Sequence, residues 1–90
     1  MEGALHLLKL NDNQATPKYG VGFATYQTGG AMKMKEFVGE TALRDYLTKR
    51  IHVHSDIAEH ALRELLAKET ADVPHVQLSD AELVNLGLKD

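Results

Sequence analysis

The chain has 90 residues, of which 43% are hydrophobic and 26% are charged, a composition typical of one globular domain. The absence of cysteine excludes disulfide bonds, and the net charge of −3 gives no general attraction to the phosphates of nucleic acid. The N-terminus lacks the pattern of a secretory signal, and no apolar run is long enough to span a bilayer. We therefore expect a single cytoplasmic domain, residues 1–90, that does not enter a membrane.

Residues 4–38 predict three strands. Residues 4–10 are apolar and end before turn-forming asparagines, and the segments 20–26 and 31–38 are rich in residues that favour strands. Between these two segments lies Gly29-Gly30, a pair that suits a tight hairpin turn because both glycines can adopt a positive φ. The order of the three segments predicts an antiparallel β-meander.

Pairing across the two glycines decides which residues share a face. The face expected to pack on helices carries Val21, Phe23, Thr25, Met32, Met34 and Val38. The opposite, partly wet face carries Tyr26, Lys33, Lys35 and Phe37. In this register Glu36 lies opposite Phe23 on the buried face, a conflict that a β-bulge near Gly20 or Gly22 would relieve.

Residues 41–68 predict two helices. The first follows Gly39 and has an apolar face with helical spacing, formed by Leu43, Tyr46, Leu47 and Ile51. The second is expected to begin near Ser55 and Asp56, which both suit a helix N-cap, and Glu59 completes a capping box with Asp56. The apolar face of this second helix contains Ile57, Ala58, Ala61, Leu62, Leu65 and Leu66.

The C-terminal residues predict an extended segment and a short helix. Residues 73–78 suit an edge strand, since Pro74 cannot donate a hydrogen bond to a neighbouring strand. Ser79 and Glu82 then form a capping box, and Gly87 suits the left-handed position that ends a helix. Residues 78–88 resemble the closing helix of sterile alpha motif domains. The strand-rich segment of this chain has no place in that all-helical fold, so we transfer no function from the resemblance.

Together these patterns predict an α+β fold. A three-stranded antiparallel β-meander packs on two helices, and a short capped C-terminal helix follows. The strand-rich part covers residues 4–38, and the helix-rich part covers residues 41–88.

Three histidines, His52, His54 and His60, fall within nine positions. Residues two apart on an extended segment point the same way, so His52 and His54 could present two imidazoles to one divalent metal ion. His60, Asp56 or Glu59 would complete a three-ligand site with an open position, which is the arrangement of catalytic zinc. This pattern suggests a metal-binding protein or a metal-dependent enzyme.

The same segment also fits a connector between the two helices. Its alternation places Ile51 and Val53 toward the core and leaves both neighbouring histidines in water. The spacing of the histidines matches no metal motif such as H-E-x-x-H, although His75 could join them from elsewhere in the fold.

A second cluster combines basic and aromatic residues. Lys18, Tyr26, Lys33 and Lys35 would form a strip for single-stranded nucleic acid if they shared one face of the hairpin. The alternative is a solvated strand face whose lysines discourage aggregation through the sheet edge.

The sequence contains no phosphate-binding glycine motif and no recognisable acid–base pair. The leading hypothesis is therefore a small non-enzymatic interaction or accessory module that needs no cofactor. It would self-associate or dock a partner protein through a sheet edge or through the acidic C-terminal segment. Metal binding and nucleic-acid binding are the alternatives.

Overall fold

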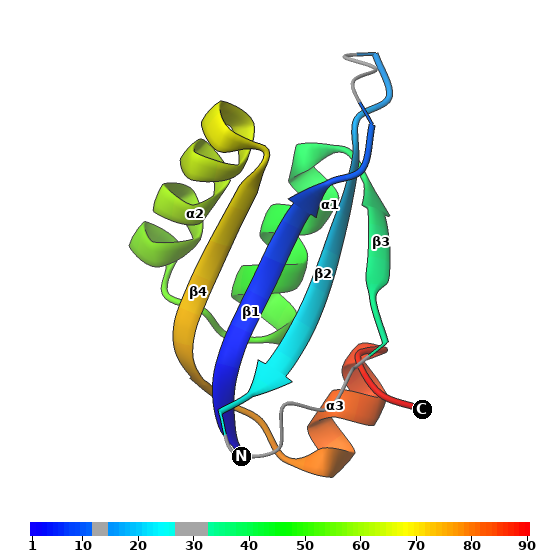
Figure 1. Cartoon of the computed structure of the whole chain (residues 1–90), viewed down its shortest axis with the longest axis vertical. Helices are drawn as coiled ribbons and strands as arrows, with labels where there is room; N and C mark the ends of the chain where they lie inside the picture. The colour runs from blue at the N-terminus through cyan, green and yellow to red at the C-terminus, as the bar shows by residue number, and fades with distance from the viewer. Residues whose placement is uncertain (12–14, 27–32) are drawn as a thin grey trace.

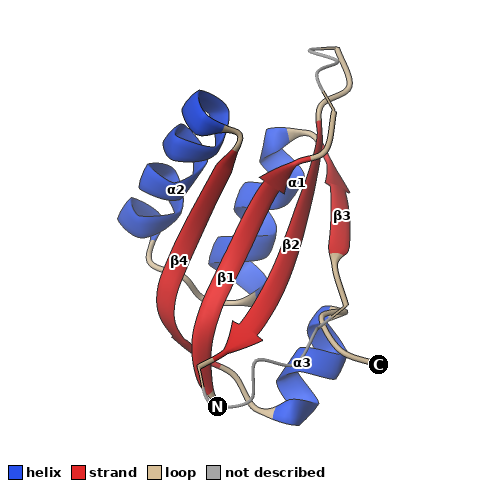
Figure 2. Ribbon diagram, viewed as in Figure 1, coloured by secondary structure: helices blue, strands red, loops and turns tan. Residues whose placement is uncertain are grey.

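The computed structural model describes residues 1–11, 15–26 and 33–90. Figures 1 and 2 show a sheet with helices behind it and a short helix at one end. The elements in chain order are β1 (Glu2–Lys9), β2 (Lys18–Thr25), β3 (Lys35–Val38), α1 (Glu40–Asp45), a π-helical turn η1 (Tyr46–Arg50), α2 (Ser55–Lys68), β4 (Thr70–Gln77) and α3 (Asp80–Leu86).

The predicted α+β class is confirmed, but the sheet has a fourth strand among the described residues. Its order is β3-β2-β1-β4, and every neighbouring pair is antiparallel. The β-meander is therefore present as expected. The extended segment predicted at 73–78 belongs to this fourth strand, β4, which starts three residues earlier at Thr70, pairs with the central strand β1 and so extends the sheet.

The hydrophobic core lies between one face of the sheet and the helices. Leu5 and Leu7 of β1 and Val21 of β2 are fully buried there, as strand alternation requires. The helices contribute further buried residues, including Leu43, Leu47, Leu62, Leu65, Leu83 and Leu88. Each such leucine contributes about 1.5–3 kcal/mol relative to an exposed position.

The predicted register of the hairpin is wrong by an odd number of residues. The structure pairs Glu36 with Gly20, three positions before Phe23. An odd shift exchanges the two faces of a strand, so Phe37 packs against the core while Glu36 and Val38 are exposed. This register removes the conflict at Glu36 without a β-bulge. The expected turn at Gly29-Gly30 lies outside the described residues.

The apolar face of the first helix is confirmed, because all four predicted residues are buried. The start of α2 differs from the prediction. His54, and not Ser55 or Asp56, is the N-cap, and its Nδ1 accepts a hydrogen bond from the Asp56 amide at 3.2 Å. The apolar face of α2 is also narrower than expected, since Ile57 and Leu66 are 51% and 48% exposed.

The prediction for α3 is confirmed in detail. Ser79 and Glu82 form both hydrogen bonds of the capping box, and Gly87 has a φ of 80°. The Leu88 amide donates to the carbonyl of Leu83 at 2.9 Å, which closes the helix. The hydrogen bonds from Ser79 lower the pKa of Glu82 below its usual value. In the described part of the chain, no helix has the length and apolarity needed to cross a membrane.

Candidate functional site

One face of the sheet is left uncovered by the helices. In Figure 1, α1 and α2 lie behind the sheet and α3 lies at its lower end, so no described element covers the front. We call this front surface the open face. It carries the residues of β1 that alternate with the core leucines, among them His6 and Leu8, and the corresponding residues of the other strands. The open face is a surface on which the sheet itself can meet a partner.

The upper part of the open face carries several apolar side chains, and the charged residues Lys18 and Glu36 lie on the same face. Leu10, Met34 and Val38 are 39%, 42% and 60% exposed, and Leu8 lies partly exposed beside them. A Cβ atom at Gly20 would lie 2.6 Å from Met34 Sδ and 3.4 Å from Leu10 Cδ1, so both side chains fold over this glycine. We call Leu8, Leu10, Met34 and Val38 the apolar patch.

The middle of the open face holds a histidine–aspartate pair. His6 Nδ1 lies 2.6 Å from Asp72 Oδ1, and the two residues are directly opposite each other in β1 and β4. On the other side of His6 lies Gly22, where an added Cβ would meet nothing within 4 Å. The carboxylate holds the hydrogen of the imidazole on Nδ1, which leaves Nε2 directed away from Asp72. The pair therefore stands beside an open space.

At the lower end of the open face, Tyr26 contacts His75 of β4. Its Oη accepts a hydrogen bond from the His75 amide at 3.1 Å, and the two rings meet edge to face at 6.0 Å. Glu2 Oε2 lies 3.5 Å from His75 Nδ1. His75 has a φ of 60° and follows Pro74 where the pairing of β1 and β4 shifts. These contacts hold the irregular part of β4 against β1.

The structure places two of the three predicted metal ligands at one cleft and separates the third. His52 and His54 line a cleft of about 290 Å³, and His75 from β4 lines the same cleft. His60 instead lies on the exposed side of α2, with Nε2 3.1 Å from Glu64 Oε1. In the described ranges, no three histidine, aspartate or glutamate side chains converge well enough to hold a metal ion. The metal site stays a prediction.

The connector interpretation agrees with the burial of this segment. Ile51 is buried, Val53 packs against the core, and His52 and His54 are exposed. The Val53 amide donates to the Leu47 carbonyl at 2.8 Å, which fastens the connector to η1. His52 adopts a φ of 66° and thereby turns the chain toward α2.

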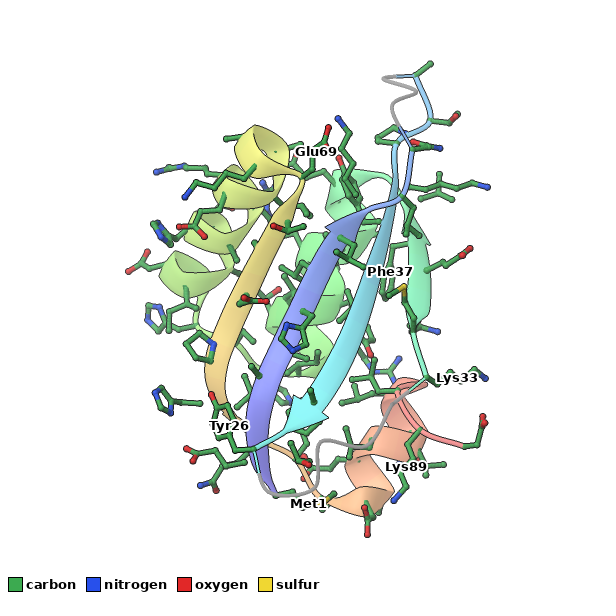
Figure 3. The ribbon with its side chains drawn as sticks, viewed as in Figure 1. Met1, Tyr26, Lys33, Phe37, Glu69 and Lys89 are labelled. Carbon is green, nitrogen blue, oxygen red and sulfur yellow. The ribbon has the colours of Figure 1, made fainter. Side chains whose placement is uncertain are left out.

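The four residues of the predicted nucleic-acid strip do not form one continuous strip, although Lys33 and Lys35 are close in sequence. Lys18 begins β2 and Tyr26 follows its end, roughly 26 Å away by the rise per residue. Tyr26 and Lys33 lie on opposite sides of the sheet's lower end (Figure 3). Lys33 pairs with Asp90 at 3.5 Å, and Lys35 Nζ lies 5.7 Å from the centre of the Phe37 ring. Nucleic-acid binding also stays a prediction.

Comparisons with protein families, with curated proteins and with solved structures found no match to this chain. Its function must therefore be argued from its own residues. The pair of His6 and Asp72 was missed by the sequence reasoning, which had named His75 as a residue that could join His52 and His54 from elsewhere in the fold. The pair depends on β4 pairing with β1, a contact that joins residues 66 positions apart and has no local sequence pattern.

Proposed function

We propose that this protein is a small non-enzymatic interaction module that binds a partner protein through the open face of its sheet. The observation that carries the proposal is the apolar patch. An antiparallel sheet that meets water on one side normally alternates apolar residues inward with polar residues outward. Here the outward positions include Leu10 and Val38, with Met34 beside them, and contiguous exposed apolar surface is typical of interaction sites.

The edges of the sheet are less suited to docking than its face. β3 has four residues, which is a short template for a further strand. β4 is longer, but Pro74 and the positive φ of His75 interrupt its edge. The acidic C-terminal segment is also engaged within the chain, because Asp80 pairs with Lys89 at 2.9 Å and Asp90 pairs with Lys33.

Site-specific photo-crosslinking tests this proposal. A photoreactive residue at position 38 lies on the open face. One at position 66 lies on the exposed side of α2, where the native side chain has a similar exposed fraction, 48% against 60%. We expect position 38 to capture a protein that position 66 does not capture. If both positions capture the same proteins, or if neither captures any, the open face is not the interaction surface.

Metal binding is a second candidate, and the cleft lined by His52, His54 and His75 supports it. Imidazole nitrogens suit zinc and nickel ions, and all three side chains are exposed at the cleft. One contact opposes the idea. Nδ1 of His54 accepts the hydrogen of the Asp56 amide, so Nε2 carries a hydrogen, and binding metal there would disrupt the N-cap of α2.

Thermal melting with zinc or nickel tests this candidate. A metal ion at about 100 times its dissociation constant would raise the melting temperature by about 10 °C or more. His75→Ala should abolish the rise, and His60→Ala should leave it unchanged, because His60 lies outside the cleft. If His60→Ala abolished it, the cluster predicted from the sequence would be the site, and no rise at all would exclude both sites.

A further inference from the structure

We propose that a second cleft of this protein binds a small organic anion that carries a planar ring. The cleft has a volume of about 340 Å³ and lies between β3 and the helical segment formed by α1 and η1. It is on the side of the sheet that the helices cover, so the proposal does not depend on the open face or on the proposed function. Clefts that bind small molecules begin at about 300 Å³, which indicates a small ligand.

The residues that line this cleft come from one strand face and one helix face. Lys35 and Phe37 are two positions apart in β3 and therefore point to the same side of the sheet. The helical residues each lie three or four positions from another of the set, so they share a face; they are Ala42, Asp45, Tyr46, Lys49 and Arg50. We call the cleft between these two faces the basic cleft. Its helical side includes a π-helical turn, an irregularity that is frequent at functional sites.

The charged side chains of the basic cleft are mostly cations. Lys35, Lys49 and Arg50 line it together with a single carboxylate, Asp45. Asp45 pairs with Lys49 at 3.6 Å, whereas Lys35 and Arg50 pair with no carboxylate of residues 1–11, 15–26 or 33–90. Lysine and arginine carry their charge at neutral pH, so the basic cleft is positive although the chain has a net charge of −3. Its charge is complementary to that of an anion.

The two cations without a carboxylate partner both lie beside the end of α3. Arg50 Nη2 donates to the Asn85 carbonyl at 3.1 Å, and Lys35 Nζ lies 3.4 Å from the position of an added Cβ at Gly87. The carbonyl end of α3 attracts positive charge and so helps to hold both side chains there. The planar guanidinium of Arg50 keeps further N–H donors, whose geometry matches a carboxylate or a phosphate. We therefore expect the anionic group of the ligand at this end of the basic cleft.

The aromatic part of the basic cleft suits a planar ring. The ring centroids of Phe37 and Tyr46 are 4.5 Å apart, and Phe37 is partly exposed while Tyr46 is 4% exposed. Ala42 and the alkyl stems of the basic side chains add apolar surface around Phe37. Lys35 Nζ lies 5.7 Å from the centre of the Phe37 ring, so positive and aromatic surfaces are adjacent. A ligand with a ring next to its anionic group matches this arrangement better than a simple ion does.

An NMR titration of isotope-labelled protein with phenyl phosphate tests the proposal. The basic cleft is shallow, so we expect a dissociation constant on the order of 0.1–1 mM for a ligand of about ten non-hydrogen atoms. Saturable shifts are expected at the amides of Lys35, Phe37 and Lys49. Inorganic phosphate, which lacks the ring, and phenol, which lacks the charge, should each bind about tenfold more weakly or worse.

A matched pair of double variants locates the site. Lys35→Gln combined with Arg50→Gln removes the two cations beside α3 and should weaken the binding of phenyl phosphate about tenfold or more. Arg63→Gln combined with Lys68→Gln removes the same charge from exposed positions of α2 and should leave the affinity unchanged.

Phe37→Leu tests the ring contact separately. It keeps an apolar side chain against the core and should weaken binding about threefold to tenfold, because the aromatic contact is lost. Circular dichroism of each variant checks that the fold is retained, and the double variants test the site whatever the stability of Phe37→Leu.

Several results would overturn the proposal. They are the absence of saturable shifts with phenyl phosphate to about 10 mM, shifts confined to residues outside the basic cleft, and inorganic phosphate binding as tightly as phenyl phosphate. The same loss of affinity in both double variants would show that only the total charge matters and would also refute the site.

Benzoate and adenosine monophosphate distinguish the source of the ligand once phenyl phosphate binds. Tighter binding of adenosine monophosphate would support a nucleotide as the ligand, and tighter binding of benzoate would support an aromatic carboxylate. Crosslinking at position 38 reports on the open face alone, so the proposed function and this proposal can fail independently.

Discussion

Tyr46 is the residue whose chemistry most clearly depends on the fold. Its side chain is 4% exposed, and its hydroxyl donates a hydrogen bond to the Leu86 carbonyl at 2.7 Å. This bond joins η1 to the end of α3. Burial raises the pKa of Tyr46 from 10.0 to about 12, although the positive charge of Arg50 acts in the opposite direction. The folded state therefore retains this proton at a pH at which the unfolded chain loses it.

We predict that the protein loses stability between pH 10 and about pH 12 because of Tyr46. A raised pKa in the folded state contributes fully below the pKa of the unfolded chain and is lost as the pH rises through the folded value. The loss should reach about 2–3 kcal/mol, at 1.36 kcal/mol for each pH unit. Tyr19, whose pKa is raised by burial and secondarily by Glu40, should add to it.

Urea denaturation at a series of pH values measures this loss. Tyr46→Phe should lower stability by about 1 kcal/mol near pH 7, because the Leu86 carbonyl loses its donor, and should flatten the alkaline decline. Tyr26→Phe is the matched control, since the Tyr26 ring is 53% exposed. An alkaline decline of the same size in Tyr46→Phe and in the wild type would contradict the assignment.

At the scale of single elements, helix ends were predictable where their rules are local. The capping box of α3 lies within four consecutive residues, so Ser79 and Glu82 could be identified without knowledge of the fold. The cap of α2 could not be identified in this way. Histidine is an unusual N-cap, and its use here depends on the connector holding the His54 ring over the Asp56 amide.

Strands were predictable as segments and in the order of the β-meander, but the register of the hairpin and the pairing of β4 with β1 were not. Val21 and Phe23 face the core as the alternation predicted, because side-chain direction along one strand is a local property. The partner of each residue in β3 depends on the length of the connection before it, which the pair Gly29-Gly30 did not determine. The faces of Glu36 and Val38 were consequently exchanged.

In the candidate site, too, features set by the local sequence were predictable, and features set by contacts between distant segments were not. The exposure of His52 and His54 was predictable, because it follows from Ile51 and Val53 pointing inward. The cleft was not predictable, since it needs His75 from the edge strand β4. The open face was not predicted either, because the incorrect register of the hairpin assigned Met34 and Val38 to the core.

For the whole molecule, the arrangement of one sheet and one layer of helices makes β1 the central element. β1 pairs with β2 on one side and with β4 on the other, and so it joins the first and the last parts of the sheet. The core is confined to one face of this strand, where Leu5 and Leu7 are fully buried. Since total stability of a small domain is about 5–15 kcal/mol, each of these leucines contributes a large share of it.

We predict that Leu5→Ala lowers the free energy of unfolding by about 2–5 kcal/mol, because it removes apolar contacts and leaves a cavity at the centre of the sheet. Leu66→Ala removes the same atoms from a side chain that is 48% exposed on α2, and it should cost less than about 1 kcal/mol. Urea denaturation measures both, with a lower midpoint and an unchanged slope expected for Leu5→Ala. Equal losses for the two substitutions would mean that the core does not lie where the structure places it.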